Sequence, residues 1–386
     1  MVTLKKRVKG KKIFYYVSCT SSYKGQMKTF EKYIGNSETP NDVLEQKKKY
    51  YATYIQLKCK LYLQYLQIKL TELHYLDQNF TPLIVLIGNS YQDFLRSLYP
   101  TELEKYQQEF NVRYIHNTTA IEGNTLSLKE TSLIIDSGIS PKSKKLREIF
   151  EIENYNRILD YVRNYDKDLS LKFILEIHRL IQRNIDENTA GTLRRIEVGI
   201  SGSEWKPPPA IMVKEELEEL LQWYTGAKKE LHTFELAGVF HHRFLQIHPF
   251  IDGNGRLARE LLNFILKKNG FPPIIIPVSE REDYMKFLEL ADTEDEGIVS
   301  LLEFFLGIAY KDNTNALMAT INQLAKQREE FEHIPSFVKV DFNELFQWYI
   351  ELLKSTIEFS DTGEELDTDQ LNVWDILGQL LQEKSL

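Results

Sequence analysis

The sequence predicts a mainly α-helical protein with a small β-hairpin at its N-terminus and a second short hairpin among the helices. Long stretches lack glycine and proline and repeat apolar residues every three or four positions, which is the spacing of one helix face. Strand-like patterns occur in two places. Residues 12–18 and 27–34 are rich in aromatic and β-branched side chains on either side of Gly25, and apolar and polar residues alternate within 192–213.

Helical patterns account for most of the remaining chain. The first helix is expected over residues 42–77, where Tyr51, Ile55 and Leu66 recur at helical spacing. Pro82 and Pro100 then introduce two further helical regions. Later helices are predicted, in order, at 127–136, 146–164, 169–184, 214–229, 234–246, 255–268, 281–292 and 297–321, and helical patterns recur at 342–357 and 370–382.

The length and composition fit several structural units. The chain has 386 residues, of which 42% are hydrophobic and 27% charged, as in a soluble globular protein. Four regions are expected: an N-terminal hairpin region, a helical extension, a helical core and a C-terminal helical extension. Their predicted bounds are 1–40, 41–110, 111–310 and 311–386.

Charge and cysteine content exclude several classes of protein. The formal net charge of -8 argues against a nucleic-acid partner, and we expect the basic run at 5–12 to be a solvated arm. Cys19 and Cys59 are too few for a disulfide framework and lack the spacing of a zinc site. No apolar run is long enough to cross a bilayer, so the sequence predicts a cytoplasmic protein without a membrane partner.

The segment 248–259 carries the clearest chemical signal, and it lies between two predicted helices. It reads His-Pro-Phe-Ile-Asp-Gly-Asn-Gly-Arg-Leu-Ala-Arg. Pro249 ends the preceding helix, while Gly253 and Gly255 permit a tight turn into the next one. Free N–H groups and the positive end of the helix dipole point the same way at such a turn, so it predicts an anion site.

Charged side chains surround this turn. Arg256 and Arg259 lie three residues apart on the first turn of the following helix, which predicts a cradle for more than one phosphate. Asp252 could hold Mg²⁺ beside the phosphates, and His248 could take a proton from an attacking hydroxyl. Each residue taken alone is more often structural, but all of them occur within twelve residues, in an order that packs them round one point.

The same twelve residues resemble the Fic signature HxFx(D/E)GNGRxxR at every specified position. The resemblance implies a Fic-type helical bundle with a β-hairpin flap. It also implies transfer of AMP from ATP to a Ser, Thr or Tyr hydroxyl of a protein, with release of pyrophosphate and with Mg²⁺ as cofactor. By this likeness His248 is the base and Asp252 the metal ligand. The implied ATP contacts are Gly253, Asn254, Gly255, Arg256 and Arg259.

A second motif lies upstream, at Thr118-Thr-Ala-Ile-Glu-Gly-Asn. Thr118, Glu122 and Gly123 resemble the (S/T)xxxE(G/N) pattern of the inhibitory helix in the same family. The resemblance implies that the Glu122 carboxylate pairs with Arg259 and blocks the position that the γ-phosphate needs. A carboxylate there would remove the cation that orients ATP and add charge repulsion. We therefore expect a self-inhibited enzyme.

Two further parts of the chain resemble segments of Fic-family proteins. The resemblance as a whole spans about residues 114–310. The alternating residues Ile196, Val198 and Ile200 resemble the flap that holds the target segment by strand-like pairing. Tyr284 lies where family members contact adenine. Asp292 stands where Asn is common in the family, and no role is assigned to it.

The sequence leaves several functions open. The same site could remove AMP by hydrolysis, with Glu122 positioning a water. The chain could instead be a nucleotide-responsive binding module or a toxin–antitoxin component, although a purely binding role would not need His248. Self-modification and a homodimer are further open alternatives for its partners.

Overall fold

The computed structural model describes residues 2–200, 205–294 and 296–313. The described residues form two compact units, and each is treated on its own. One comprises the chain up to Glu72 together with Gln78–Leu86, and the other comprises Leu73–Asp77 and the chain from Ile87 onward. The predicted helices at 342–357 and 370–382 lie outside the described residues.

The first unit begins with a three-stranded antiparallel sheet in the order β1-β2-β3, where the sequence predicts only a hairpin. The strands are β1 (Thr3–Lys9), β2 (Lys12–Tyr23) and β3 (Gln26–Asn36). Lys24 and Gly25, with φ of 44° and 80°, form the tight turn between β2 and β3. The basic run at 5–12 is solvent-exposed, as expected, but it is not a free arm, because it forms most of β1, the turn after it and the start of β2. Its exposed side chains Lys5 and Arg7 pair with Glu31 on β3.

One long helix, α1 (Asn41–Leu70), packs against β2 and β3. The core between them contains Val17, Cys19, Ile34, Tyr51, Ile55 and Cys59. The two cysteines are free thiols, as expected. The helix ends seven residues before the predicted position 77, and Thr71 after it is already extended.

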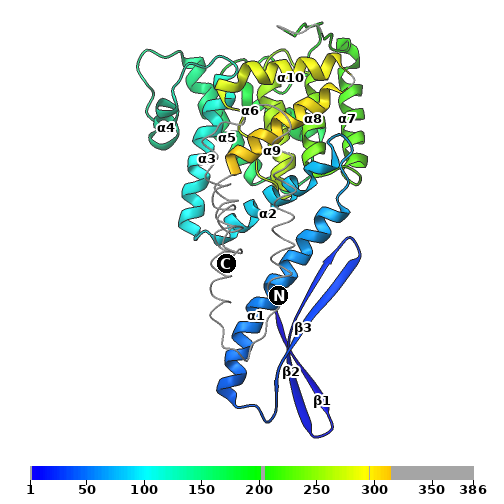
Figure 1. Cartoon of the computed structure of the whole chain (residues 1–386). Coiled ribbons are helices and arrows are strands. Elements are labelled where there is room, and N and C mark those ends of the chain that lie inside the picture. The colour runs from blue at the N-terminus through cyan, green and yellow to red at the C-terminus, as the bar shows by residue number, and fades with distance from the viewer. Residues whose placement is uncertain (1, 201–204, 295, 314–386) are drawn as a thin grey trace, which may run out of the picture. The chain divides into compact units, whose positions relative to one another are not determined.

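The second unit is helical throughout, and Figure 1 shows α8 and α9 near its centre. The boundary between the units falls within α2 (Thr81–Ser97), which follows the short η1 (Gln78–Phe80). The remaining helices are α3 (Pro100–Ala120), α4 (Leu128–Ser137), α5 (Leu146–Arg163), α6 (Leu171–Gln182), η2 (Ala210–Met212), α7 (Val213–Ala227), α8 (Thr233–Ile247), α9 (Asn254–Lys268), η3 (Val278–Glu280), α10 (Arg281–Thr293) and a last helical stretch at 297–313.

The central pair α8 and α9 is buried along most of its length. Phe240 and Phe244 of α8 are fully buried, as are Leu261 and Ile265 of α9. α8 and α9 pack on each other, while α6 and α3 contact α9 and α7 contacts α8. Burial of apolar side chains stabilises such packing by about 25 cal/mol for each Å² of apolar surface removed from water. The chain segment that joins the two helices is therefore anchored on both sides by the tightest part of the core.

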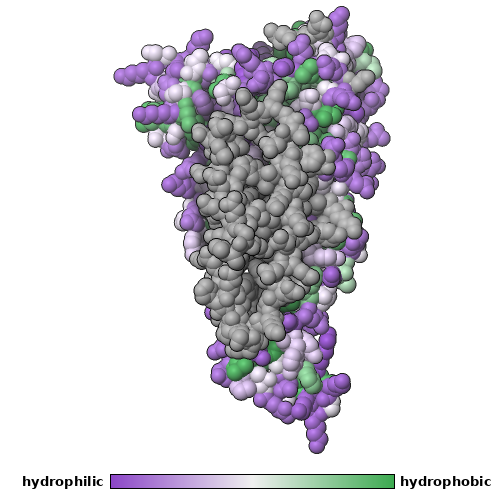
Figure 2. All heavy atoms as spheres, viewed as in Figure 1, coloured by the Kyte–Doolittle hydropathy of each residue, from purple (hydrophilic) through white to green (hydrophobic). Residues whose placement is uncertain are grey.

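The described surface in the view of Figure 2 is mostly hydrophilic, with small scattered apolar areas. Among the described residues, every helix falls short of the length and apolar character that a membrane span requires.

Candidate active site

The turn between α8 and α9 is shaped by left-handed backbone at both ends. α8 stops at His248, whose φ of 47° and ψ of 60° point the chain away from the helix axis. Gly253, with φ of 86°, precedes α9. A Cβ there would lie 3.1 Å from Cγ2 of Ile181, so the position is both strained and crowded for any other residue.

The Asn254 side chain closes this turn from within. Its Oδ1 accepts a hydrogen bond from the backbone N–H of Phe250 at 3.0 Å, and its Nδ2 donates to the Phe250 carbonyl at 2.8 Å. The amide group is therefore committed at both ends inside the turn. What Asn254 can offer an anion in this arrangement is its backbone N–H at the start of α9.

Two buried side chains hold the turn from outside. The Arg194 Nε donates to the His248 carbonyl at 2.8 Å, and the Arg194 backbone N–H donates to the Pro249 carbonyl at 2.9 Å. The His178 Nδ1 accepts from the Gly191 N–H at 3.0 Å, so the ring proton lies on Nε2, which donates to the Asp252 carbonyl at 2.9 Å. Arg194 and His178 thus fix the backbone on which the predicted base and metal ligand stand.

The imidazole of His248 faces a cavity and is held neutral. Burial lowers its pKa, and the positive charge of Arg194 lowers it further. Its side chain is one of those lining the cavity described below. A neutral imidazole at physiological pH can accept a proton, which is what a general base requires.

Asp252 and Arg256 belong to one charged network at the start of α9. The Asp252 Oδ1 accepts from Arg256 at 3.0 Å and from the Gly253 N–H at 2.7 Å, and its Oδ2 accepts from Arg147 at 2.6 Å. Burial raises the Asp252 pKa, but the charges of Arg256 and Arg147 outweigh it, so the pKa is lowered and the carboxylate is ionised. Arg256 also lies 3.4 Å from the Glu151 carboxylate.

The predicted inhibitory contact, the pairing of Glu122 with Arg259, is present as an ion pair. The Arg259 guanidinium is buried and donates to the Glu122 Oε1 at 2.7 Å, to the Thr118 Oγ1 at 2.9 Å and to the Thr118 carbonyl at 2.8 Å. Although burial raises the Glu122 pKa, Arg259 and Arg256 lower it overall. Gly123, with φ of 96°, follows this carboxylate in the turn after α3.

Glu122 also lies against the start of α9. A Cβ added to Gly255 would come within 2.5 Å of the Glu122 Oε1. The carboxylate therefore occupies the space beside the first turn of α9, where free N–H groups and the helix dipole favour negative charge.

These groups surround a single cavity of about 580 Å³, within the range of sizes of small-molecule sites. Of the residues predicted for the site, six line it: Glu122, Ile200, His248, Gly255, Arg259 and Tyr284. Asp252 and Gly253 lie in the adjoining turn, and Asn254 and Arg256 lie on the first turn of α9. Thr118 lies near the end of α3, and Gly123 lies in the turn after it. Within the described residues, no group of three or more His, Cys, Asp or Glu side chains could hold a metal by itself.

Tyr284 forms part of the cavity wall and is itself buried. Its hydroxyl lies 2.8 Å from the His241 Nε2. Burial raises the Tyr284 pKa to about 12 and lowers the His241 pKa to about 3. Asp292 also lines the cavity and accepts from His242 at 2.8 Å. His241 therefore supports Tyr284 from behind the cavity wall, whereas His242 itself lines the cavity beside Asp292.

The flap does not form the predicted hairpin in the described residues. Residues 192–200 and 205–209 carry no strand, and η2 follows at Ala210–Met212. Ile196 is 59% exposed, whereas Ile200 reaches the cavity. Arg194 shows why pairing is absent, since it donates to the carbonyls of Ile196 and Pro208 and so takes backbone acceptors that a ladder would use.

Sequence reasoning missed three residues that shape the site: His178, Arg194 as a support of the turn, and Arg147. His178 looks like an ordinary apolar-face histidine of α6, and only its position opposite the turn reveals its role. Arg147 sits at the start of α5, far from the motif in sequence. A signal was present only for Arg194, which precedes the alternating segment.

Part of the chain is similar to a known protein family. Residues 168–266 match the model of the Fic/DOC family. The chain is 34% identical over 209 residues to "Protein adenylyltransferase fic-1" of Caenorhabditis briggsae, a match that covers 53% of this chain and 41% of that protein. The chain therefore spans about two fifths of the length of this curated relative.

Solved structures give the same result for the fold. A Fic domain-containing signaling protein from Bacteroides thetaiotaomicron has a TM-score of 0.56 and 26% identity, over 61% of this chain and 98% of that one. Fic-1 (aa134–508) from C. elegans has a TM-score of 0.55 and 26% identity, over 73% and 86% of the two chains. The helices that position the signature at 248–259, the family match and the similar solved structures together identify a Fic/DOC-type domain within this chain, with the family match at residues 168–266.

Proposed function

We propose that the chain is a self-inhibited protein adenylyltransferase that transfers AMP from ATP to a hydroxyl of a protein. The observation that carries this proposal is the position of Glu122. Its carboxylate pairs with Arg259 and lies against Gly255, in the same cavity as the neutral His248. An anion held at a helix N-terminus beside a candidate base marks the place where a phosphate chain would bind.

The chemistry follows from the groups round the cavity. The substrate hydroxyl oxygen attacks the α-phosphorus of ATP and forms a new P–O bond, while the bond to pyrophosphate breaks. His248 takes the hydroxyl proton, for which its lowered pKa suits it. The N–H groups at the start of α9 and the guanidinium groups of Arg256 and Arg259 oppose the negative charge of the phosphates.

Asp252 suits the metal role, since its carboxylate is ionised and 44% exposed. Three donors reach its two oxygens, which leaves lone-pair capacity for a cation. Mg²⁺ commonly takes one carboxylate together with phosphate oxygens and waters, and when bound it would neutralise phosphate charge. Arg147 and Arg256 hold the carboxylate in place at the mouth of the turn.

The inhibitory contact explains the self-inhibition that we propose. While Glu122 holds Arg259, that guanidinium cannot turn to the far end of a triphosphate, and the carboxylate repels any phosphate beside Gly255. Release of Glu122 would free both the cation and the anion site. The backbone at 197–200, which is in no helix or strand, would then be available to hold a segment of the target protein carrying a Ser, Thr or Tyr hydroxyl.

A second function is supported by the same carboxylate. Glu122 is ionised and lines the cavity together with His248, so it could orient a water toward an AMP-modified side chain. The site would then remove AMP by hydrolysis. Comparing AMP addition and AMP release by the unmodified chain on one target decides which direction dominates.

The experiment that tests the main proposal uses labelled ATP. The Glu122→Gly variant is incubated with α-labelled or γ-labelled ATP in host lysate and without it. We expect protein-bound label from α-labelled ATP only, either on the chain itself or on a lysate protein. Label from γ-labelled ATP would indicate phosphate transfer, and no label in either arm would contradict the proposal.

A further inference from the structure

A second cavity, of about 400 Å³, lies in the helical unit and shares no lining residue with the candidate active site. Its walls come from α2, α3, α5, α9 and the segments that follow α5 and α9. Five aromatic rings line it, which belong to Tyr91, Tyr106, Phe110, Tyr165 and Phe264. The amide side chains of Gln107 and Asn111 complete the wall on α3.

Three cationic side chains also line this cavity, and they differ in their interaction partners. Lys268 donates to the backbone carbonyl of Lys167, so its ammonium group has a partner. Arg163 lies 3.5 Å from Asp160 on the exposed side of α5. Lys267 makes neither a hydrogen bond nor an ion pair with any residue that the structure describes, and its ammonium lies 4.8 Å from the centre of the Phe110 ring.

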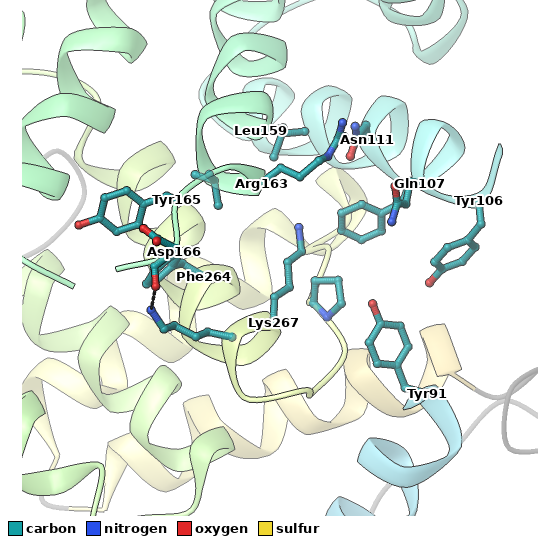
Figure 3. A pocket seen from close by; sticks show the side chains of 14 residues that line it. Tyr91, Tyr106, Gln107, Asn111, Leu159, Arg163, Tyr165, Asp166, Phe264 and Lys267 are labelled. Carbon is teal, nitrogen blue, oxygen red and sulfur yellow. Dashed lines mark hydrogen bonds between the residues drawn. The ribbon is translucent and has the colours of Figure 1, made fainter. Parts of the chain in front are cut away.

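Figure 3 shows Lys267 reaching into the middle of the cavity, with Arg163 and Asn111 beyond it. Asp166 is the only carboxylate of the lining, and it lies beside Tyr165 and away from the Lys267 ammonium. Burial lowers the Lys267 pKa, and the charge of Arg163 lowers it further against an opposing effect of Glu260. An anion beside Lys267 and Arg163 would favour the charged form of the buried lysine, so binding of an anion and protonation of Lys267 support each other.

We propose that this cavity binds a small anion built on a planar aromatic ring, with a carboxylate or phosphate group between Lys267 and Arg163. Figure 3 shows Tyr91 and Tyr106 with their hydroxyls directed toward each other, at the side of the cavity where the ring would lie. Aromatic walls favour offset or edge contacts with a ring, and the paired cations favour the charged group. A volume of about 400 Å³ suits a ligand of this size.

Calorimetry on the full chain, without ATP, tests the site independently of the proposed transfer activity. Four probes separate the two recognition elements: benzoate, phenyl phosphate, inorganic phosphate and benzyl alcohol. We expect benzoate or phenyl phosphate to bind with a Kd on the order of 1 mM or tighter, and the two probes that carry only a charge or only a ring to bind at least about tenfold more weakly. The tighter of the two aromatic anions identifies the charged group as carboxylate or phosphate.

Variants place the binding in this cavity. Combining Arg163→Ala with Lys267→Met, which keeps most of the lysine stem, should weaken the aromatic anion by about tenfold or more. The matched control is Arg157→Ala, on the same helix and ion-paired with Glu153 but outside the cavity lining. Circular dichroism and thermal unfolding check that each variant folds. Equal affinity in the double variant and the wild type, or absence of binding by both aromatic anions, would overturn the proposal.

Discussion

The Arg259 guanidinium is shared between Thr118, near the end of α3, and Glu122, in the turn that follows α3. It donates to the Glu122 Oε1 at 2.7 Å and to both the hydroxyl and the carbonyl of Thr118. Because the guanidinium is buried, removing one partner leaves charge that the others cannot fully offset. The Glu122–Arg259 contact thus stands beside the packing of α3 on α9, and moving the turn after α3 or changing Glu122 would break it.

Replacing Glu122 by Gly should raise incorporation of label from α-labelled ATP by about tenfold or more, since it frees Arg259 and removes the negative charge beside Gly255. Adding His248→Ala in the same chain should abolish the gain. Filter or gel measurement of bound label gives both results. The control is Glu130→Gln, at the start of α4 and absent from the cavity lining, which should label like the wild type. Equal labelling with and without His248 would show that the base is assigned wrongly.

Tyr114 lies one helical turn before Thr118 on α3, and we expect it to support the inhibitory contact from there. Tyr114 and Thr118 are four residues apart on α3, and Glu122 follows four residues later in the turn after the helix. The buried Tyr114 hydroxyl donates to Glu260 of α9 at 3.0 Å. Tyr114→Phe should lower the free energy of unfolding by about 1–3 kcal/mol, because the buried Glu260 loses its donor. It should also raise labelling when Glu122 is present, but not in the Glu122→Gly chain.

Urea unfolding and the labelling assay measure these two effects separately. Tyr161→Phe is the control, since that hydroxyl forms no hydrogen bond with any residue in the described ranges. A rise in labelling of the same size in the Glu122→Gly background would mean that Tyr114 acts on catalysis and not through the inhibitory contact.

The helices could be predicted because the residues that begin, pattern and end each one lie within its own short stretch of sequence. The predicted helix at 255–268 differs from the observed α9 by a single residue at its start, since Gly253 and Gly270 bracket a clear apolar stripe. The strand β1 was missed for the opposite reason. Every residue of β1 is exposed, so its sequence lacks the apolar alternation that marks a half-buried strand, and only pairing with β2 defines it.

The predictability of the site residues also depends on whether they are close together or far apart in the sequence. His248 and Arg259 belong to one segment, so a pattern within twelve residues could reveal them. His178 contacts that segment from α6, some seventy positions away in sequence, through a single ring. Asn254 shows a different limit: its residue type fits a phosphate contact, but the structure commits its side chain to Phe250.

The lowered pKa of His248 predicts how the rate depends on pH. A base works when it is unprotonated, so the Glu122→Gly chain should transfer AMP at a constant rate near neutral pH and lose rate only below the ordinary histidine value of 6.5. Removing Glu122 takes away a charge that raises the His248 pKa, which moves the acid limb further down. Initial rates between about pH 5 and about pH 9 locate this limb. An acid limb centred above 6.5 would contradict a buried imidazole beside Arg194.

His178 should make the folded state sensitive to acid. Burial lowers its pKa from 6.5 to about 4, so below pH 6.5 the unfolded chain takes up a proton that the folded chain does not. Stability is therefore retained above 6.5 and falls as the pH drops toward 4, by on the order of 3 kcal/mol from this residue. His178→Gln can still accept from Gly191 and donate to the Asp252 carbonyl, and it should reduce the pH slope of the urea-derived unfolding free energy by about one proton. The exposed His74→Gln should keep the wild-type slope, and an unchanged slope in His178→Gln would show that the ring is already protonated in the folded protein.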